Sequence, residues 1–102
     1  VSSVNHGFRP ADYLAGLPAD RIGQIHLAGH SDHGTHLLDT HDAAVCAEVW
    51  DVYRDAVRRF GPIPTLVEWD DRIPPFEDVQ AEAERARAAE AEVLGDVCAR
   101  TA

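Results

Sequence analysis

The stretch from Gln24 to Asp42 reads QIHLAGHSDHGTHLLDTHD, and the rest of the chain is interpreted outward from it. It opens as an apolar, β-prone segment that contains His26, and it continues as a loop in which histidines and aspartates alternate. Five of the chain's six histidines lie within it. Because imidazole and carboxylate groups are the ordinary ligands of divalent transition metals at neutral pH, the stretch predicts a metal site at the end of a strand.

The elements around this stretch follow the order strand, helix, strand, helix, which predicts an α/β fold. A nearly continuous apolar strand is typical of a parallel sheet that is covered on both faces. Polar residues follow each strand, as they do in a β/α barrel, where the active site lies at the carboxyl ends of the strands. Two strands cannot close a barrel, so we expect residues 1–102 to be part of one domain whose remaining strands come from further sequence or from other chains. The expected elements are an extended segment Val1–Val4, a short helix Ala11–Ala15, a strand Ile22–Ala28, a loop Gly29–Asp42, a helix Ala43–Phe60 capped by Asp42, a strand Thr65–Trp69, and a helix Phe76–Cys98.

Apolar residues recur at helical spacing in both long helices. The final helix is rich in Ala and Glu, and its run from Glu82 to Glu92 is expected to be a solvated face with paired charges. In the helix before it, Trp50 and Tyr53 are expected to belong to the core. The apolar stripe of that helix comprises Val45, Val49, Val52, Ala56 and Phe60, widened by Trp50, Tyr53 and Val57. The stripe of the final helix comprises Phe76, Val79, Ala83, Ala86 and the segment Val93–Val97.

Composition excludes several classes of partner. The formal net charge is −9 and all nine basic residues are arginines, which argues against nucleic acid as a partner. There is no bilayer-length apolar run and no signal peptide, so neither a membrane span nor secretion is expected. Cys46 and Cys98, expected on separate helices, are interpreted as half-buried thiols in a reducing cytoplasm.

Four residues are candidate metal ligands: His26, Asp39, His41 and Glu68. Asp39 and His41 are two positions apart and so lie on one side of an extended segment, while Asp42 is the better helix cap. On spacing alone, His26 could equally be a core histidine bonded to a carbonyl group. Burying Glu68 in an apolar strand is costly unless a cation, or alternatively an arginine, compensates its charge.

Three further residues, His6, His30 and Asp70, are candidates for orienting a ligand or contacting a substrate. His6 is expected to lie in the same mouth without binding metal directly. Asp70 is equally explained as an exposed carboxylate in a turn. His33 and His36 are expected to be solvated.

Several motifs together resemble the C-terminal part of the DUF692 (UPF0276) family. They are VNHGF, QIHLAGH, DTHD, a helix with VWxxY, PTLVEWD and IPPF, and the resemblance runs from about Val1 to Arg87. It implies a xylose-isomerase-like TIM (β/α)8 barrel, of which this chain would be the last third, with two or three iron ions in the barrel mouth. It also implies that His26, Asp39, His41 and Glu68 are iron ligands, with others supplied by earlier strands.

The resemblance further implies an activity. The family includes the methanobactin-biosynthesis enzyme, so the full-length protein would be an iron-dependent oxidative enzyme that modifies cysteine in a ribosomally made precursor peptide. One iron would activate O₂, another would take the substrate thiolate, and a small partner protein would present the peptide. Two alternatives stay open: a hydrolase or isomerase on the same barrel with zinc or manganese, and a non-catalytic module that self-associates through an exposed sheet edge.

Overall fold

The computed structural model describes residues 1–101, with side chains described for residues 1–95. At its centre lie two parallel strands, β1 (Ile25–Ala28) and β4 (Thr65–Glu68), in a register that places Ala28 opposite Glu68. Parallel strands need a crossover connection, and helix α3 (Ala47–Phe60) supplies it. The mixed α/β class and the parallel strands expected from the sequence are therefore confirmed.

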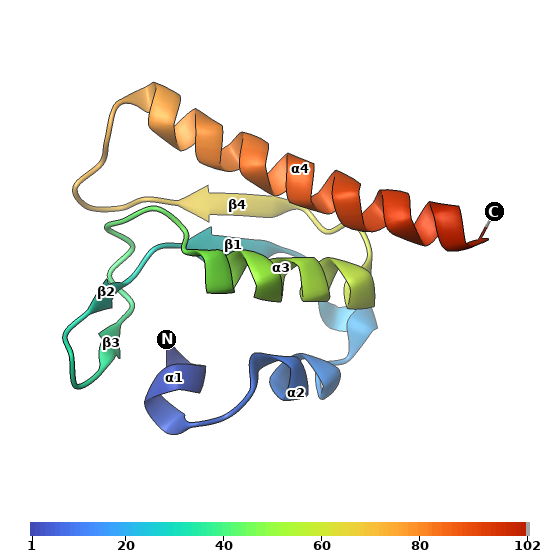
Figure 1. The fold of residues 1–102 in the computed structure, drawn as a ribbon, viewed down its shortest axis with the longest axis horizontal. Helices are drawn as coiled ribbons and strands as arrows, with labels where there is room; N and C mark the ends of the chain where they lie inside the picture. The colour runs from blue at the N-terminus through green and yellow to red at the C-terminus, as the bar shows by residue number, and fades with distance from the viewer. Residues whose placement is uncertain (102) are drawn as a thin grey trace.

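Figure 1 shows β1 and β4 side by side, with both arrowheads at the same end of the molecule. Helix α4 (Phe76–Thr101) runs along β4 and packs against α3. The predicted loop after β1 contains a small antiparallel pair, which lies at the arrowhead end. The remaining elements are the helices α1 (Ser2–His6) and α2 (Pro10–Ala15), the 3-10 helix η1 (Ala19–Arg21), and the strands β2 (Ser31–Asp32) and β3 (Leu37–Leu38).

The core lies between α3, α4 and the sheet. Trp50 and Tyr53 are buried in it, as predicted. The buried positions recur at intervals of three and four on both long helices, which keeps them on one face of each. The core cluster comprises Leu27, Val45, Trp50, Tyr53, Val57, Ala86, Ala89 and Val93.

The N-terminal segment differs from the expectation. Residues Val1–Val4 were expected to be extended, but Ser2–His6 form α1. Gly7 ends this helix in the left-handed conformation, with φ of 71°, and its N–H donates a hydrogen bond to the Ser3 carbonyl. Glycine adopts this conformation without steric cost, so Gly7 provides a helix end that the apolar pattern alone did not indicate.

Helix α3 begins at Ala47, four residues later than expected. Cys46, not Asp42, occupies the N-cap position, so this cysteine precedes the helix. The preceding segment is kept non-helical by tertiary contacts, because the backbone of Ala43 packs directly on Gly29. The Asp42 carboxylate accepts a hydrogen bond from the Thr40 hydroxyl group instead of capping a helix.

Helix α4 also corrects two expectations. Phe76, placed in the apolar stripe, is 72% exposed, whereas Glu82, placed on the solvated face, is only 6% exposed. The other charged residues of that face include exposed pairs such as Glu84–Arg87, as expected. The side chains of Val97 and Cys98 lie outside the described residues. Among the described residues, no helix combines the length and the apolar character needed to cross a bilayer.

Candidate metal centre

The four predicted metal ligands lie together in the structure. His26 belongs to β1 and Glu68 ends β4, while Asp39 and His41 lie on the segment that follows β3. All four line one pocket of about 450 Å³. The fold thus brings three separate stretches of sequence to one site.

Glu68 lies between the two histidines. One of its oxygens contacts Nδ1 of His26, and the other lies 3.0 Å from Nδ1 of His41. Because His26 pairs with Leu66 across the sheet, His26 and Glu68 project from the same face. The Glu68 side chain is 18% exposed, and among the described residues its ion-pair partners are these histidines and no arginine.

His41 has carboxylate oxygens facing both of its ring nitrogens. Nε2 lies 2.9 Å from Oδ1 of Asp39, and Nδ1 lies 2.8 Å from Oδ2 of Asp70 as well as near Glu68. A neutral imidazole has one donor nitrogen and one acceptor nitrogen, so it cannot satisfy carboxylates on both sides. A doubly protonated ring, a protonated carboxyl group, or a cation in place of a proton satisfies this arrangement.

The same carboxylates favour the charged form of the ring. The hydrogen bond with Asp70 raises the pKa of His41, burial opposes this, and the charges of Asp39 and Glu68 raise it further. Ligand atoms of His41, Glu68 and Asp70 all lie within 4.8 Å of one another, close enough to hold one ion.

The backbone of His41 joins the loops that follow the two strands. Its φ is 53°, an uncommon left-handed value for a residue other than glycine. Its N–H donates to the Gly29 carbonyl at 3.1 Å, and its carbonyl accepts from the Asp70 N–H at 2.8 Å. These two hydrogen bonds hold His41 in this conformation at the point where its ring faces the carboxylates.

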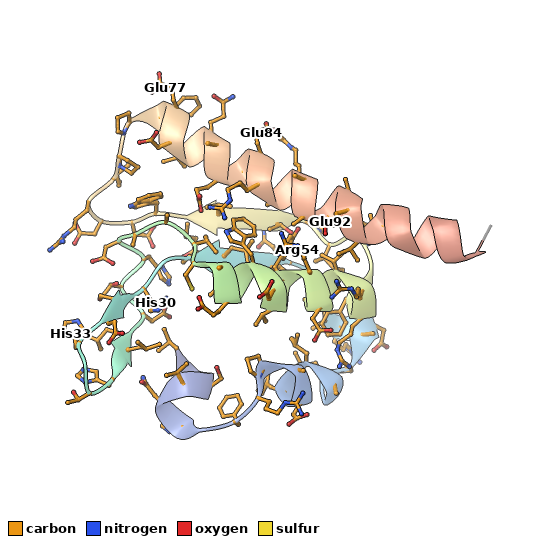
Figure 2. The ribbon with its side chains drawn as sticks, viewed as in Figure 1. His30, His33, Arg54, Glu77, Glu84 and Glu92 are labelled. Carbon is orange, nitrogen blue, oxygen red and sulfur yellow. The ribbon has the colours of Figure 1, made fainter. Side chains whose placement is uncertain are left out.

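The other predicted residues occupy different positions. Asp70 contacts His41 directly, and His30 is a half-buried residue lining the same pocket. His6 lies in the last turn of α1, is exposed, and is not among the side chains that line this pocket. His33 and His36 are exposed, as predicted, with their rings stacked 5.4 Å apart. Figure 2 shows His30 and His33 on the segment that extends beyond β1.

Sequence reasoning missed two side chains that hold the histidine-rich segment. The Asn5 side chain donates to the Leu37 carbonyl and accepts from the Leu37 N–H, both at 2.8 Å. The Glu82 carboxylate accepts a hydrogen bond from the Val45 N–H. The available signal for Glu82 was its position four residues before Ala86, on the apolar line of α4. Asn5 belongs to the VNHGF motif, but the motif did not indicate its partner, which lies 32 residues away.

The chemistry of this donor set fits a metal centre. Imidazole nitrogens suit iron and zinc, and carboxylate oxygens suit manganese and magnesium, so a mixed set is typical of iron, manganese or zinc sites. The carboxylates outnumber the imidazoles, which favours hard divalent cations over copper(I). The donors are His26, His41, Asp39, Glu68 and Asp70.

Comparison with known proteins identifies the class to which the chain belongs. Residues 1–91 match the family described as RiPP precursor modification enzymes MbnB/TglH/ChrH. The chain is therefore a member of this family, whose enzymes modify ribosomally synthesised precursor peptides.

Curated relatives carry the UPF0276 designation, as the sequence motifs indicated. A UPF0276 protein of Anaeromyxobacter sp. is 60% identical over 94 residues, covering 92% of this chain and 33% of the relative. Relatives from Caulobacter vibrioides and Acaryochloris marina are 53% and 52% identical, covering 86% and 84% of this chain and 31% of each relative. This chain spans about a third of the length of these relatives. No solved structure matches it.

Proposed function

We propose that this chain contributes part of a multinuclear iron centre to an enzyme that oxidises cysteine in a ribosomally made precursor peptide. The observation that carries the proposal is the position of Glu68, which contacts His26 and His41, with His41 facing carboxylates on both sides. Membership of a family of precursor-peptide modification enzymes supports the substrate class. When bound, iron supplies oxygen activation and a site for the soft thiolate of the substrate.

The residues of this chain have distinct roles in the proposed centre. One oxygen of Glu68 faces His26 and the other faces His41, so the carboxylate could contribute to two separate sets of metal ligands. Asp39 and Asp70 either bind metal or orient the His41 ring, because each faces one of its nitrogens. His26, with its side chain 49% exposed, is the more accessible of the two histidines, since the His41 side chain is 26% exposed.

The remaining parts of the proposal concern the full-length protein. In it, this chain forms β/α units of a TIM barrel, and earlier strands supply further ligands. The parallel pair, with Glu68 at the carboxyl end of β4 and with Asp39 and His41 in the connection that follows β1, agrees with the location of active sites in such barrels. A small partner protein presents the precursor peptide at this mouth.

The test is the metal content of the full-length protein, purified without oxygen and measured by elemental mass spectrometry. We expect two or more irons per chain, and we expect Glu68→Gln and His26→Ala to lose them. His33→Ala is the matched control, because this histidine lies in the same segment but is exposed and outside the pocket. It should retain the parental content.

The other outcomes have defined meanings. Zinc or manganese alone, with no oxygen consumption in the presence of thiol peptides, would favour a hydrolase or an isomerase on the same scaffold. A protein without bound metal would refute the proposal. Iron retained in both the Glu68 and the His26 variants would place the centre elsewhere in the protein.

A further inference from the structure

Glu82 is a buried carboxylate that lies outside the candidate metal centre. Its residue is 6% exposed, and its two oxygens have different partners. Oε2 accepts a hydrogen bond from the Val45 backbone N–H at 3.0 Å, and Oε1 lies 3.0 Å from Nη1 of Arg85. The Arg85 side chain is 53% exposed, and burying a carboxylate is costly, so this ion pair alone does not account for a buried glutamate here.

The partner of Glu82 lies on the segment that carries His41. Val45 is itself buried and follows His41 by four residues. At the start of this segment, the His41 N–H is bonded to the Gly29 carbonyl, and the Ala43 backbone packs on Gly29. The segment from His41 to Val45 is therefore held by the β1 loop at one end and by α4 at the other.

Arg85 contacts the second oxygen of the Glu82 carboxylate. Its guanidinium group lies over the ring of Trp50, with 4.9 Å from Cζ to the ring centroid. Trp50 is 3% exposed and belongs to the first turn of α3. Glu82 thus connects α4, α3 and the His41 segment through contacts that each have a defined geometry.

We propose that Glu82 is a positioning residue for the metal centre, which fixes the His41 segment through the Val45 N–H. That Glu82 acts on a metal centre rests on the proposed function, whereas its hydrogen bond with the Val45 N–H does not. Because the bond requires an acceptor oxygen at the end of a glutamate-length side chain, reach matters more than charge. Glutamine keeps the reach and loses the charge, and aspartate does the opposite.

The experiment compares Glu82→Gln and Glu82→Asp in the full-length protein. Glu84→Asp is the matched control, because Glu84 lies on the same helix and pairs with an arginine three residues later, but its side chain is 57% exposed. Figure 2 shows Glu84 on the outer side of α4, away from β4. The first measurement is amide hydrogen exchange of residues 41–46 in the metal-free protein. We expect about 10-fold faster exchange there in Glu82→Asp and parental rates in the other two variants.

The second measurement is a titration with Co²⁺ alone, followed by its visible absorption spectrum. Changes to groups that orient metal ligands typically weaken binding by about 10- to 100-fold, and we expect Glu82→Asp to lie near the lower end of that range. The spectrum of bound Co²⁺ should shift in Glu82→Asp and stay parental in Glu82→Gln and Glu84→Asp.

Parental exchange and parental Co²⁺ binding in Glu82→Asp would overturn the proposal. Uniformly faster exchange in α3 and α4 with an unaltered Co²⁺ spectrum would also overturn it, because the role would then be structural only. If Glu82→Asp does not fold, Glu82→Gln decides. A folded Glu82→Gln protein with the parental Co²⁺ spectrum supports the proposal that the length of the side chain matters. A folded Glu82→Gln protein that has lost this spectrum contradicts it. A parent that binds no Co²⁺ would refute the proposed function, and hydrogen exchange would then decide alone whether Glu82 fixes the segment.

Discussion

His41 is surrounded by three carboxylates, so a proton and a metal ion compete for the same ring. Its pKa is raised in the folded, metal-free protein, above the value of about 6.5 expected in the unfolded chain. The stabilisation from its protonated form is therefore present in full below about pH 6.5, and it is lost as pH rises through the folded-state pKa. Binding a cation requires the loss of that proton.

We therefore predict opposite pH trends for stability and for metal binding. Between about pH 6 and pH 8, the metal-free protein should lose stability, while its apparent affinity for Co²⁺ should increase. Urea unfolding and Co²⁺ titration at several pH values measure the two trends. His41→Asn should reduce the slope of stability with pH, and His36→Asn, at an exposed position, should leave it unchanged. An identical slope in His41→Asn and the parent would contradict this assignment.

At the scale of elements, the connection between β1 and α3 determines the position of the site. It folds back as the β2–β3 hairpin and returns to pack on Gly29 at the end of β1. A Cβ atom at Gly29 would lie 2.0 Å from the Ala43 carbonyl oxygen and 2.8 Å from that of Ala44. Both contacts are with backbone, which cannot move aside as a flexible side chain could. The close approach therefore requires glycine.

Gly29→Ala should destabilise the protein by about 2 kcal/mol or more, because overpacking of this kind typically costs about 1–3 kcal/mol and backbone relieves it poorly. The substitution should also lower the metal content, since the Gly29 carbonyl accepts a hydrogen bond from the His41 N–H. Gly23→Ala is the control: a Cβ there meets nothing within 4 Å, and its effect should stay within about 0.5 kcal/mol. Chemical denaturation measures both variants. Equal stability of the two would show that the segment can shift without cost.

At the scale of the whole molecule, the parallel sheet consists of β1 and β4, and within the described residues each of these strands is paired on one side only. Unpaired strand edges promote association between chains, particularly next to exposed apolar side chains. Leu66 of β4 is such a residue, with an exposed fraction of 44%. Phe76, at the start of α4, is also exposed but does not belong to the sheet.

We predict that the 102-residue chain alone self-associates at concentrations of about 10–100 µM, because chains with unpaired strand edges associate at micromolar to millimolar concentrations. Leu66→Lys should weaken this association, because a charged residue on an edge strand opposes pairing. Phe76→Lys should leave it unchanged. Sedimentation equilibrium measures the three proteins. A monomeric parent across this range would show that the edge is protected.

Local patterns in the sequence were sufficient to predict much of the fold and the position of two candidate ligands. The β-prone run before Ala28 and the helical spacing around Tyr53 predicted a parallel strand–helix–strand unit, because each depends on residues within a few positions. The motifs around His26 and Glu68 indicated the family. The expected position of both residues near the ends of apolar strands also indicated that they would meet, because the carboxyl ends of parallel strands lie at one edge of a sheet.

Only the tertiary structure determined the features that depend on distant partners. The contact of Asp70 with His41 joins residues 29 positions apart, and the burial of Glu82 depends on Val45, 37 positions away. The late start of α3 has the same origin, because the packing of Ala43 on Gly29 competes with the local tendency to form a helix. Nearby residues determine periodicity and turns, whereas the free energy of burying a charge depends on which groups the completed fold places around it.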